Sequence, residues 1–144
     1  MKKTEYNAFL FAHLALFVVF VWFGSLKLFG LSPAGALVTD LFNHTLGIMV
    51  PFSADTFIIL LGALEVIIGS LFMIPRMERV AMVLLIPHMI TTVLPLFLLP
   101  AVTWSGFMIP TLEGQYILKN LVIIALAFMV FADLGKKRVE LTSI

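Results

Sequence analysis

Four long stretches, each poor in charged side chains, constrain this chain more than any other feature. They cover residues 8–29, 56–74, 80–100 and 116–133. An α-helix needs roughly 20 apolar residues to cross about 30 Å of hydrocarbon. Because lipid offers no hydrogen-bond partners, each crossing segment must satisfy its own backbone as a helix. The sequence therefore predicts an all-α fold, a four-helix transmembrane bundle that forms a single domain over residues 1–144.

Composition supports a membrane protein and excludes several other classes. Hydrophobic residues make up 62% of the chain, whereas soluble domains carry roughly 45–50%. The net charge is +1 and the basic residues are scattered, so we expect no nucleic-acid partner. The absence of cysteine excludes a disulfide, a thiolate metal site and dithiol redox chemistry within this chain. The first apolar stretch exceeds the roughly 7–15 residues of a signal-peptide core, so we expect a retained span.

The basic residues predict the orientation of the bundle. All but two of the nine lysines and arginines lie at the N-terminus, between the second and third spans, or at the C-terminus, namely Lys2, Lys3, Arg76, Arg79, Lys136, Lys137 and Arg138. With four spans these three places share one side, which the positive-inside rule makes cytoplasmic. We expect a multi-pass protein of the bacterial inner (plasma) membrane with both termini in the cytoplasm.

The first outer loop carries a further helical pattern over residues 33–49. Ser32 is a candidate N-cap, with Pro33 at the first helical position. Apolar residues occupy one face, so we expect an amphipathic helix on, or dipping into, the outer leaflet. Asp40 and His44 lie one turn apart on the polar face, but two ligands are too few for a metal site and we expect none. In the second outer loop, Trp104 is typical of an interfacial anchor.

Prolines mark the third span. Pro87 and Pro95 fall inside it and Pro100 closes it. Transmembrane helices tolerate proline where neighbouring groups satisfy the freed carbonyls. We therefore expect a kinked third helix and not a break.

Helical spacing gathers the few polar and small residues of the spans onto inward faces. The first span carries a stripe of His13, Phe17, Phe20, Gly24 and Lys27. Small residues on such faces let helices approach closely, and the helix-packing candidates are Gly24, Gly62 and Gly69. The candidates for ligand binding or proton relay are Lys27, Glu65, His88, Thr91, Thr92, Lys119 and Asn120.

Glu65 is the most demanding of these residues, because a charge at the bilayer centre costs at least about 2.5–3.5 kcal/mol on insertion scales. With a rise of about 1.5 Å per residue, Glu65 lies near the midplane and His88 within one turn of it. By the same rise, Lys119 lies roughly 8 Å and Lys27 roughly 12 Å toward the outer side. We predict that Glu65 lies within ion-pair or hydrogen-bond reach of Lys119 or His88, with Lys27 closing the same cavity from outside.

Three segments carry a family resemblance. They are "FVWFGSLKLFGLSPAG", "GALEVIIGSL" and "GQYILKNLVIIALAFMVFAD", with shared positions at Trp22, Gly24, Lys27, Glu65, Gly69, Gly114, Lys119 and Asn120. Their order and spacing resemble the first, second and fourth helices of DoxX-like integral membrane proteins, closest to the reactive-chlorine-resistance branch of the inner membrane. The resemblance implies a four-helix membrane protein whose relatives are linked to quinone-dependent respiratory or sulfur oxidation, oxidative-stress resistance or receptor assembly.

The polar cavity leaves several functions open. The first hypothesis is a redox or oxidative-stress accessory without autonomous catalysis, which holds a quinone or small amphiphile between Lys27, Glu65, His88 and Lys119. Its partner would be a membrane oxidoreductase or a second copy of the chain. The alternatives are a small proton-coupled transporter or channel that uses Glu65, and a membrane-protein assembly factor. A buried pair that only fixes helix register is the structural alternative.

Overall fold

The computed structural model describes residues 3–47 and 49–142. Its helices and strands, in chain order, are α1 (Lys3–Leu28), α2 (Gly35–Thr45), α3 (Ala54–Met73), α4 (Glu78–Val93), α5 (Pro95–Leu98), α6 (Pro100–Thr103), β1 (Trp104–Gly106), β2 (Ile109–Pro110) and α7 (Leu112–Thr142). Within the described chain, four helical segments are long and apolar enough to cross a membrane: Thr4–Leu28, Ala54–Met73, Glu78–Leu98 and Leu112–Ala132. The predicted all-α four-helix bundle with an extra helix after the first span is confirmed.

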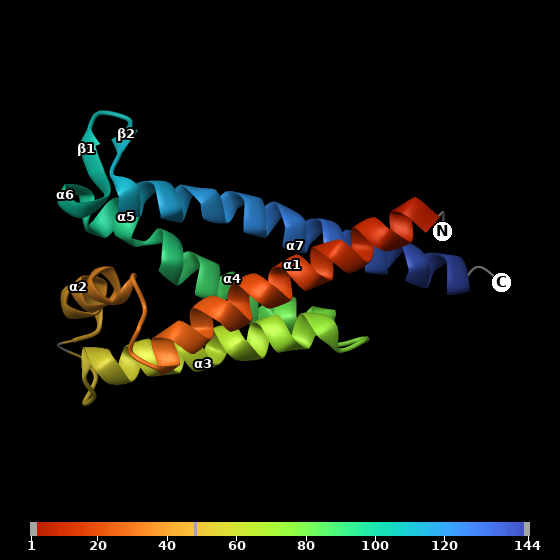
Figure 1. Ribbon diagram of the computed structural model, residues 1–144, viewed down its shortest axis with the longest axis horizontal. Coiled ribbons are helices and arrows are strands. Elements are labelled where there is room, and N and C mark those ends of the chain that lie inside the picture. Colours follow the sequence, from red (N-terminus) through yellow and green to blue (C-terminus); the bar gives the residue numbers. More distant parts are fainter. Residues whose placement is uncertain (1–2, 48, 143–144) are drawn as a thin grey trace.

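The four spans run antiparallel, and the bundle has two distinct ends (Figure 1). One end holds the start of α1, the end of α7 and the connection between α3 and α4; we call it the terminal end. The opposite end holds α2 and the two-stranded β1–β2 hairpin; we call it the hairpin end. Because the number of spans is even, the start of α1 and the end of α7 lie at the same end of the bundle, as the sequence predicted.

The helix pair α1–α3 forms the most extensive contact in the bundle. The buried core includes Leu16 and Phe20 from α1, Ile68 and Phe72 from α3, Ala81, Met82, Leu85 and Met89 from α4, and Ala127 and Val130 from α7. The stripe predicted on the first span faces this core, because His13, Phe20, Gly24 and Lys27 are buried and Phe17 is half-buried. The hydrophilic side of α1 thus points inward, away from lipid.

The α2 helix is shorter than predicted and is capped differently. It begins at Gly35 with Ala34 as its N-cap, so Ser32 and Pro33 lie before the helix and not at its N-cap and first position. The Ser32 hydroxyl instead accepts a hydrogen bond from the backbone N–H of Ala34 (3.3 Å). It ends at Thr45, so Met49, the last residue of the predicted range 33–49, lies beyond it and is exposed. The buried Phe42 packs near Phe57 with ring centroids 5.4 Å apart. These contacts fix α2 against α3, at the hairpin end.

The third span passes its prolines in two different ways. Pro87 lies inside α4, and the Thr91 hydroxyl donates to the carbonyl of Pro87 (3.0 Å). At Pro95 the helix assignment is interrupted, yet Leu94 keeps helical angles (φ −50°, ψ −39°) and α5 follows at once. The third span therefore continues past Pro95 without a break, and Glu78–Leu98 forms one candidate span. Pro100, predicted to close the span, instead begins α6, because proline suits the first position of a helix.

Candidate functional site

Glu65 lies between two basic side chains inside the bundle. Its Oε2 is 2.6 Å from Lys27 Nζ, and its Oε1 is 3.3 Å from His88 Nε2. All three residues are buried, with 7% of Glu65, 7% of Lys27 and 4% of His88 exposed. Each carboxylate oxygen therefore faces one basic group, and we call Lys27, Glu65 and His88 the ion triad. With a neutral imidazole its charges cancel, which explains how this carboxylate is accommodated away from water.

The direction of the helices explains why Lys27 and Glu65 meet. In an α-helix each Cα–Cβ bond tilts toward the helix N-terminus. The N-terminus of α1 is at the terminal end, so Lys27, near the opposite end of α1, leans toward the middle of the bundle. The N-terminus of α3 is at the hairpin end, so Glu65 leans back toward Lys27. The lysine predicted to close the cavity from outside thus becomes the direct partner of the carboxylate.

His88 leaves one buried polar atom without a partner. Its Nε2 faces Glu65, while its ring packs edge-on against Phe20 at a centroid distance of 5.8 Å. Its Nδ1 is buried and finds no hydrogen-bond partner among the described residues. If Nε2 carries the proton toward the carboxylate, Nδ1 is an acceptor with an unused lone pair. Such a group calls for a donor, because an unpaired buried polar atom costs about 1–3 kcal/mol.

Lys119 does not join the triad. It is exposed, and its Nζ lies 5.2 Å from the centroid of the Tyr116 ring, which is also exposed. Because α7 starts at the hairpin end, the side chain of Lys119 leans toward that end and away from the level of Glu65. The buried face of α7 instead carries Ile117, Ala127 and Val130. The predicted four-residue cavity is therefore a three-residue cluster.

The remaining polar candidates satisfy other groups. The hydroxyl of Thr91 donates to the Pro87 carbonyl and that of Thr92 to the His88 carbonyl (2.9 Å), so both are bound to the backbone of α4. Asn120 is half-buried on α7, four residues before Ile124. Thr92 thus meets His88 only through its backbone carbonyl, and no interaction among the described residues joins any of these three side chains to the side chains of the ion triad.

The three glycine candidates lie where α1 meets α3. A Cβ on Gly24 would be 2.7 Å from the carbonyl oxygen of Gly62, and a Cβ on Gly62 would be 2.7 Å from that of Gly24. A Cβ on Gly69 would be 2.9 Å from the Cβ of Phe20. These distances are too short for a side chain, so glycine lets the two backbones touch. The close approach also brings Lys27 over α3, within reach of Glu65.

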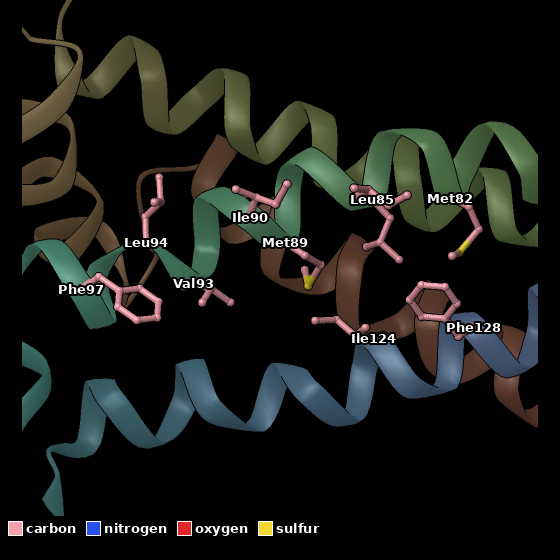
Figure 2. A pocket seen from close by; sticks show the side chains of 10 residues that line it. Met82, Leu85, Met89, Ile90, Val93, Leu94, Phe97, Ile124 and Phe128 are labelled. Carbon is pink, nitrogen blue, oxygen red and sulfur yellow. The ribbon is translucent and has the colours of Figure 1, made fainter. Parts of the chain in front are cut away.

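A groove that the sequence did not predict opens between α4 and α7 (Figure 2). Its volume is about 460 Å³, and every side chain that lines it is apolar. The lining residues are Met82, Leu85, Ile86, Met89, Ile90, Val93, Leu94, Phe97, Ile124 and Phe128. In Figure 2, Met82 and Leu85 extend from α4 toward Phe128 of α7, and Met89 extends toward Ile124. In the sequence these residues look like any lipid-facing helix surface, so only the packing distinguishes them.

Comparison with family models, with curated proteins and with solved structures gives no match to this chain. The structure by itself describes a multi-pass membrane protein with four candidate spans. Helix α4 contributes both to the buried ion triad and to the apolar groove.

Proposed function

We propose that the protein binds a single-chain amphiphile inside the bilayer, of the quinone and quinol class, and supports redox physiology without catalysing a reaction itself. The position of His88 carries the proposal. Leu85 and Met89, which precede and follow His88 on α4, both line the groove. A molecule in the groove would pass within one helical turn of the buried, unpartnered Nδ1 of His88. An apolar groove beside a nitrogen that lacks a hydrogen-bond partner suits a ligand with a hydrocarbon tail and a small polar head group.

The dimensions of the groove favour a hydrocarbon chain over a helix. Its wall on α4 and α5 runs from Met82 to Phe97, about 22 Å at 1.5 Å per residue. A volume of about 460 Å³ spread along a wall of about 22 Å makes the groove narrow. A hydrocarbon chain whose carbon neighbours lie about 4–4.5 Å away needs about 16–20 Å², whereas a helix about 10–12 Å across needs about 80–110 Å².

The tautomer of His88 favours the reduced form of such a ligand. Nε2 lies 3.3 Å from Glu65 Oε1, so a proton on this nitrogen forms a hydrogen bond to the carboxylate. Nδ1 then accepts a hydrogen bond, which a quinol hydroxyl can donate and a quinone carbonyl cannot. We therefore expect the quinol to bind more tightly than the quinone, by about five-fold for one hydrogen bond of about 1 kcal/mol.

A fluorophore placed in the groove tests this function, and the absence of cysteine makes single-cysteine variants simple to prepare. Val93→Cys places bimane in the groove, and Val122→Cys places it on the lipid-exposed side of α7 as the matched control. In nanodiscs we expect decylbenzoquinone to quench the Val93 probe saturably and the Val122 probe only in proportion to its concentration. Anaerobic addition of the weakly quenching decylhydroquinone should displace the quinone and restore fluorescence.

The variant His88→Met should remove the preference for the hydroquinone while saturable binding of the tail remains. Proportional quenching at both positions would exclude a binding groove. If the protein binds neither compound but co-purifies with one membrane protein in constant ratio, the assembly-factor hypothesis gains.

A second candidate function is proton-coupled transport, which the ion triad favours. Glu65 is about 16 Å from the start of α3 by helical rise, in the middle of the span. It joins basic groups from α1 and α4, so a change in its charge would act on three helices. Glu65→Gln should then abolish pH-dependent solute flux in liposomes while the protein still folds. Flux that persists in this variant, or wild-type liposomes that move nothing, would exclude this function.

We further propose that the protein is DoxX-like and lies in the bacterial inner membrane with the terminal end in the cytoplasm. Support for the family comes from two of its three motifs, because Gly24 of the first lies against Gly62 of the second and Lys27 of the first meets Glu65 of the second. Support for the orientation comes from Arg76 and Arg79, which lie at the terminal end. Protease accessibility in oriented vesicles tests the orientation.

A further inference from the structure

The connection between the third and fourth spans lacks formal charge. From Val80 to Leu112 the sequence contains no Asp, Glu, Lys or Arg. This segment covers most of α4, then α5, α6 and both strands of the hairpin. A loop that emerges into water usually carries charged residues, whereas a segment at the membrane interface does not need them. The hairpin and the short helices that lead into it are therefore unusually apolar.

The tip of the hairpin presents three consecutive large apolar side chains. Phe107 is 96% exposed, Met108 74% and Ile109 59%, so most of the surface of each side chain is uncovered. Met108 adopts φ +58°, a left-handed conformation that Gly or Asn accepts more readily. A non-glycine residue there costs of order 1–3 kcal/mol of backbone strain. The turn thus carries an apolar side chain at a position where a glycine would be less strained.

The base of the hairpin is firmly held, in contrast to its tip. The Trp104 indole N–H donates to the Leu96 carbonyl (3.0 Å), and the Thr111 hydroxyl donates to the Val102 carbonyl (2.7 Å). A Cβ on Gly114 would overlap the carbonyl oxygen of Thr103, so α7 packs closely against the end of α6. A rigid base means that the direction of the tip is fixed by the fold.

That direction is sideways. In Figure 1 the hairpin leaves the bundle at the start of α7 and projects away from the long axis of the helices. Leu112, the first residue of the fourth candidate span, follows the hairpin after one residue, so the hairpin lies directly beside the end of that span. An element at this depth that extends laterally lies along the membrane surface and not above it.

We propose that Phe107, Met108 and Ile109 form an anchor that inserts into the headgroup and acyl boundary of the leaflet at the hairpin end. Large apolar side chains on a fixed turn bind an interface by burying apolar area, as amphipathic interfacial segments do. Trp104, half-buried at the base, occupies the headgroup level. The anchor fixes the hairpin relative to the membrane, and through Gly114 it fixes the start of α7.

A lipid surface fits this tip better than a second copy of the chain. Three large side chains offer at most roughly 450–750 Å², even if Met108 and Ile109 each bury as much as the 150–250 Å² typical of aromatic residues. A stable protein interface needs about 800 Å² from each partner. The tip is therefore too small for a dimer contact by itself, whereas membrane insertion requires no minimum area.

Single-cysteine spin labels in proteoliposomes test the anchor directly. Phe107→Cys and Ile109→Cys replace exposed residues, and Asp55→Cys, exposed at the same end of the bundle, is the matched control. We expect the ratio of oxygen to water-soluble nickel-complex accessibility to be several-fold higher at 107 and 109 than at 55. Equal ratios at the three positions would overturn the proposal.

A second reading of the same samples tests the competing partner. Spin–spin broadening at position 107 that disappears when labelled protein is diluted with unlabelled protein would overturn lipid insertion in favour of a contact between copies. Unchanged line shapes on dilution, together with protection from the nickel complex, support the anchor.

Discussion

The contact between α1 and α3 and the contact between α4 and α7 use opposite means to pack helices in the same solvent. In the first, Gly24 and Gly62 bring the backbones together, with a notional Cβ of either only 2.7 Å from the carbonyl oxygen of the other. In the second, large side chains such as Met89 and Phe128 hold the helices apart and leave a groove of about 460 Å³. Lipid is as apolar as these side chains, so fit and not hydrophobicity decides which pair closes.

The two contacts also differ in charge. The closed side carries Lys27 and Glu65, whereas the lining of the groove contains no polar residue. A charge pair is tolerable where the helices exclude lipid and place the partners in contact, and it would be costly along an open apolar groove. The comparison therefore predicts that substitutions on the closed side cost stability and that those at the groove do not.

The largest expected effect is that of Lys27→Met. Among the residues that the structure describes, it leaves Glu65 with His88 as its one basic neighbour. Removal of one partner from a buried pair typically costs about 3–5 kcal/mol of unfolding free energy. An SDS-unfolding titration in mixed micelles measures the loss. Lys119→Met is the matched control. We expect its unfolding free energy to change by less than about 1 kcal/mol, because an exposed cation–π contact contributes only about 0.5–1 kcal/mol.

The double variant Lys27→Met/Glu65→Leu separates pairing from packing. We expect it to be more stable than Lys27→Met alone, because no unpaired charge remains. A double variant as unstable as the single one would mean that the stem of Lys27, and not its charge, holds α1 against α3.

A matched pair of phenylalanines gives the next largest effect. Phe72 is 1% exposed on α3, whereas Phe128 is 55% exposed on α7 at the groove. In a bilayer, Phe72→Ala does not lose the free energy of transferring the side chain out of water, because the unfolded helices stay in lipid. The cavity that it leaves, roughly 100 Å³ at about 24 cal/mol per Å³, still costs about 2 kcal/mol. We expect Phe128→Ala to cost less than about 1 kcal/mol, because acyl chains refill the space. Equal losses in the same titration would show that α4 and α7 pack as tightly as α1 and α3.

The sequence predicted the spans well because their signal is physical and local. Length and hydropathy located four helices, and the stripe from His13 to Lys27 identified the inward face of α1. The sequence also indicated that Glu65 needs a basic neighbour, and the structure supplies His88 and Lys27. These inferences depend only on periodicity within one helix and on the cost of an isolated charge in lipid.

Lys119 was misplaced because depth alone does not determine contact. Its distance from Glu65 along the membrane normal was compatible with a pair, but the tilt of Cα–Cβ bonds on α7 directs its side chain toward Tyr116. The groove was missed for a related reason. Met89 and Ile124 are apolar, as lipid-facing residues are, so the sequence does not distinguish them. They line a groove only because α4 and α7 are spaced apart.

The smallest of these effects tests the closed contact itself. Gly62→Ala places a methyl group 2.7 Å from both the Gly24 carbonyl oxygen and the Cβ of Lys27, so α1 must move away from α3. Overpacking of this kind costs about 1–2 kcal/mol, and the shift should also lengthen the contact between Lys27 and Glu65. Gly35→Ala is the control, because apart from the adjacent backbone no heavy atom of the described residues lies within 4 Å of its notional Cβ. In the same titration we expect Gly62→Ala to lose most of its effect when Lys27→Met is already present, since both changes weaken one contact. Additive losses would instead show that the glycine contact and the ion pair stabilise the bundle independently.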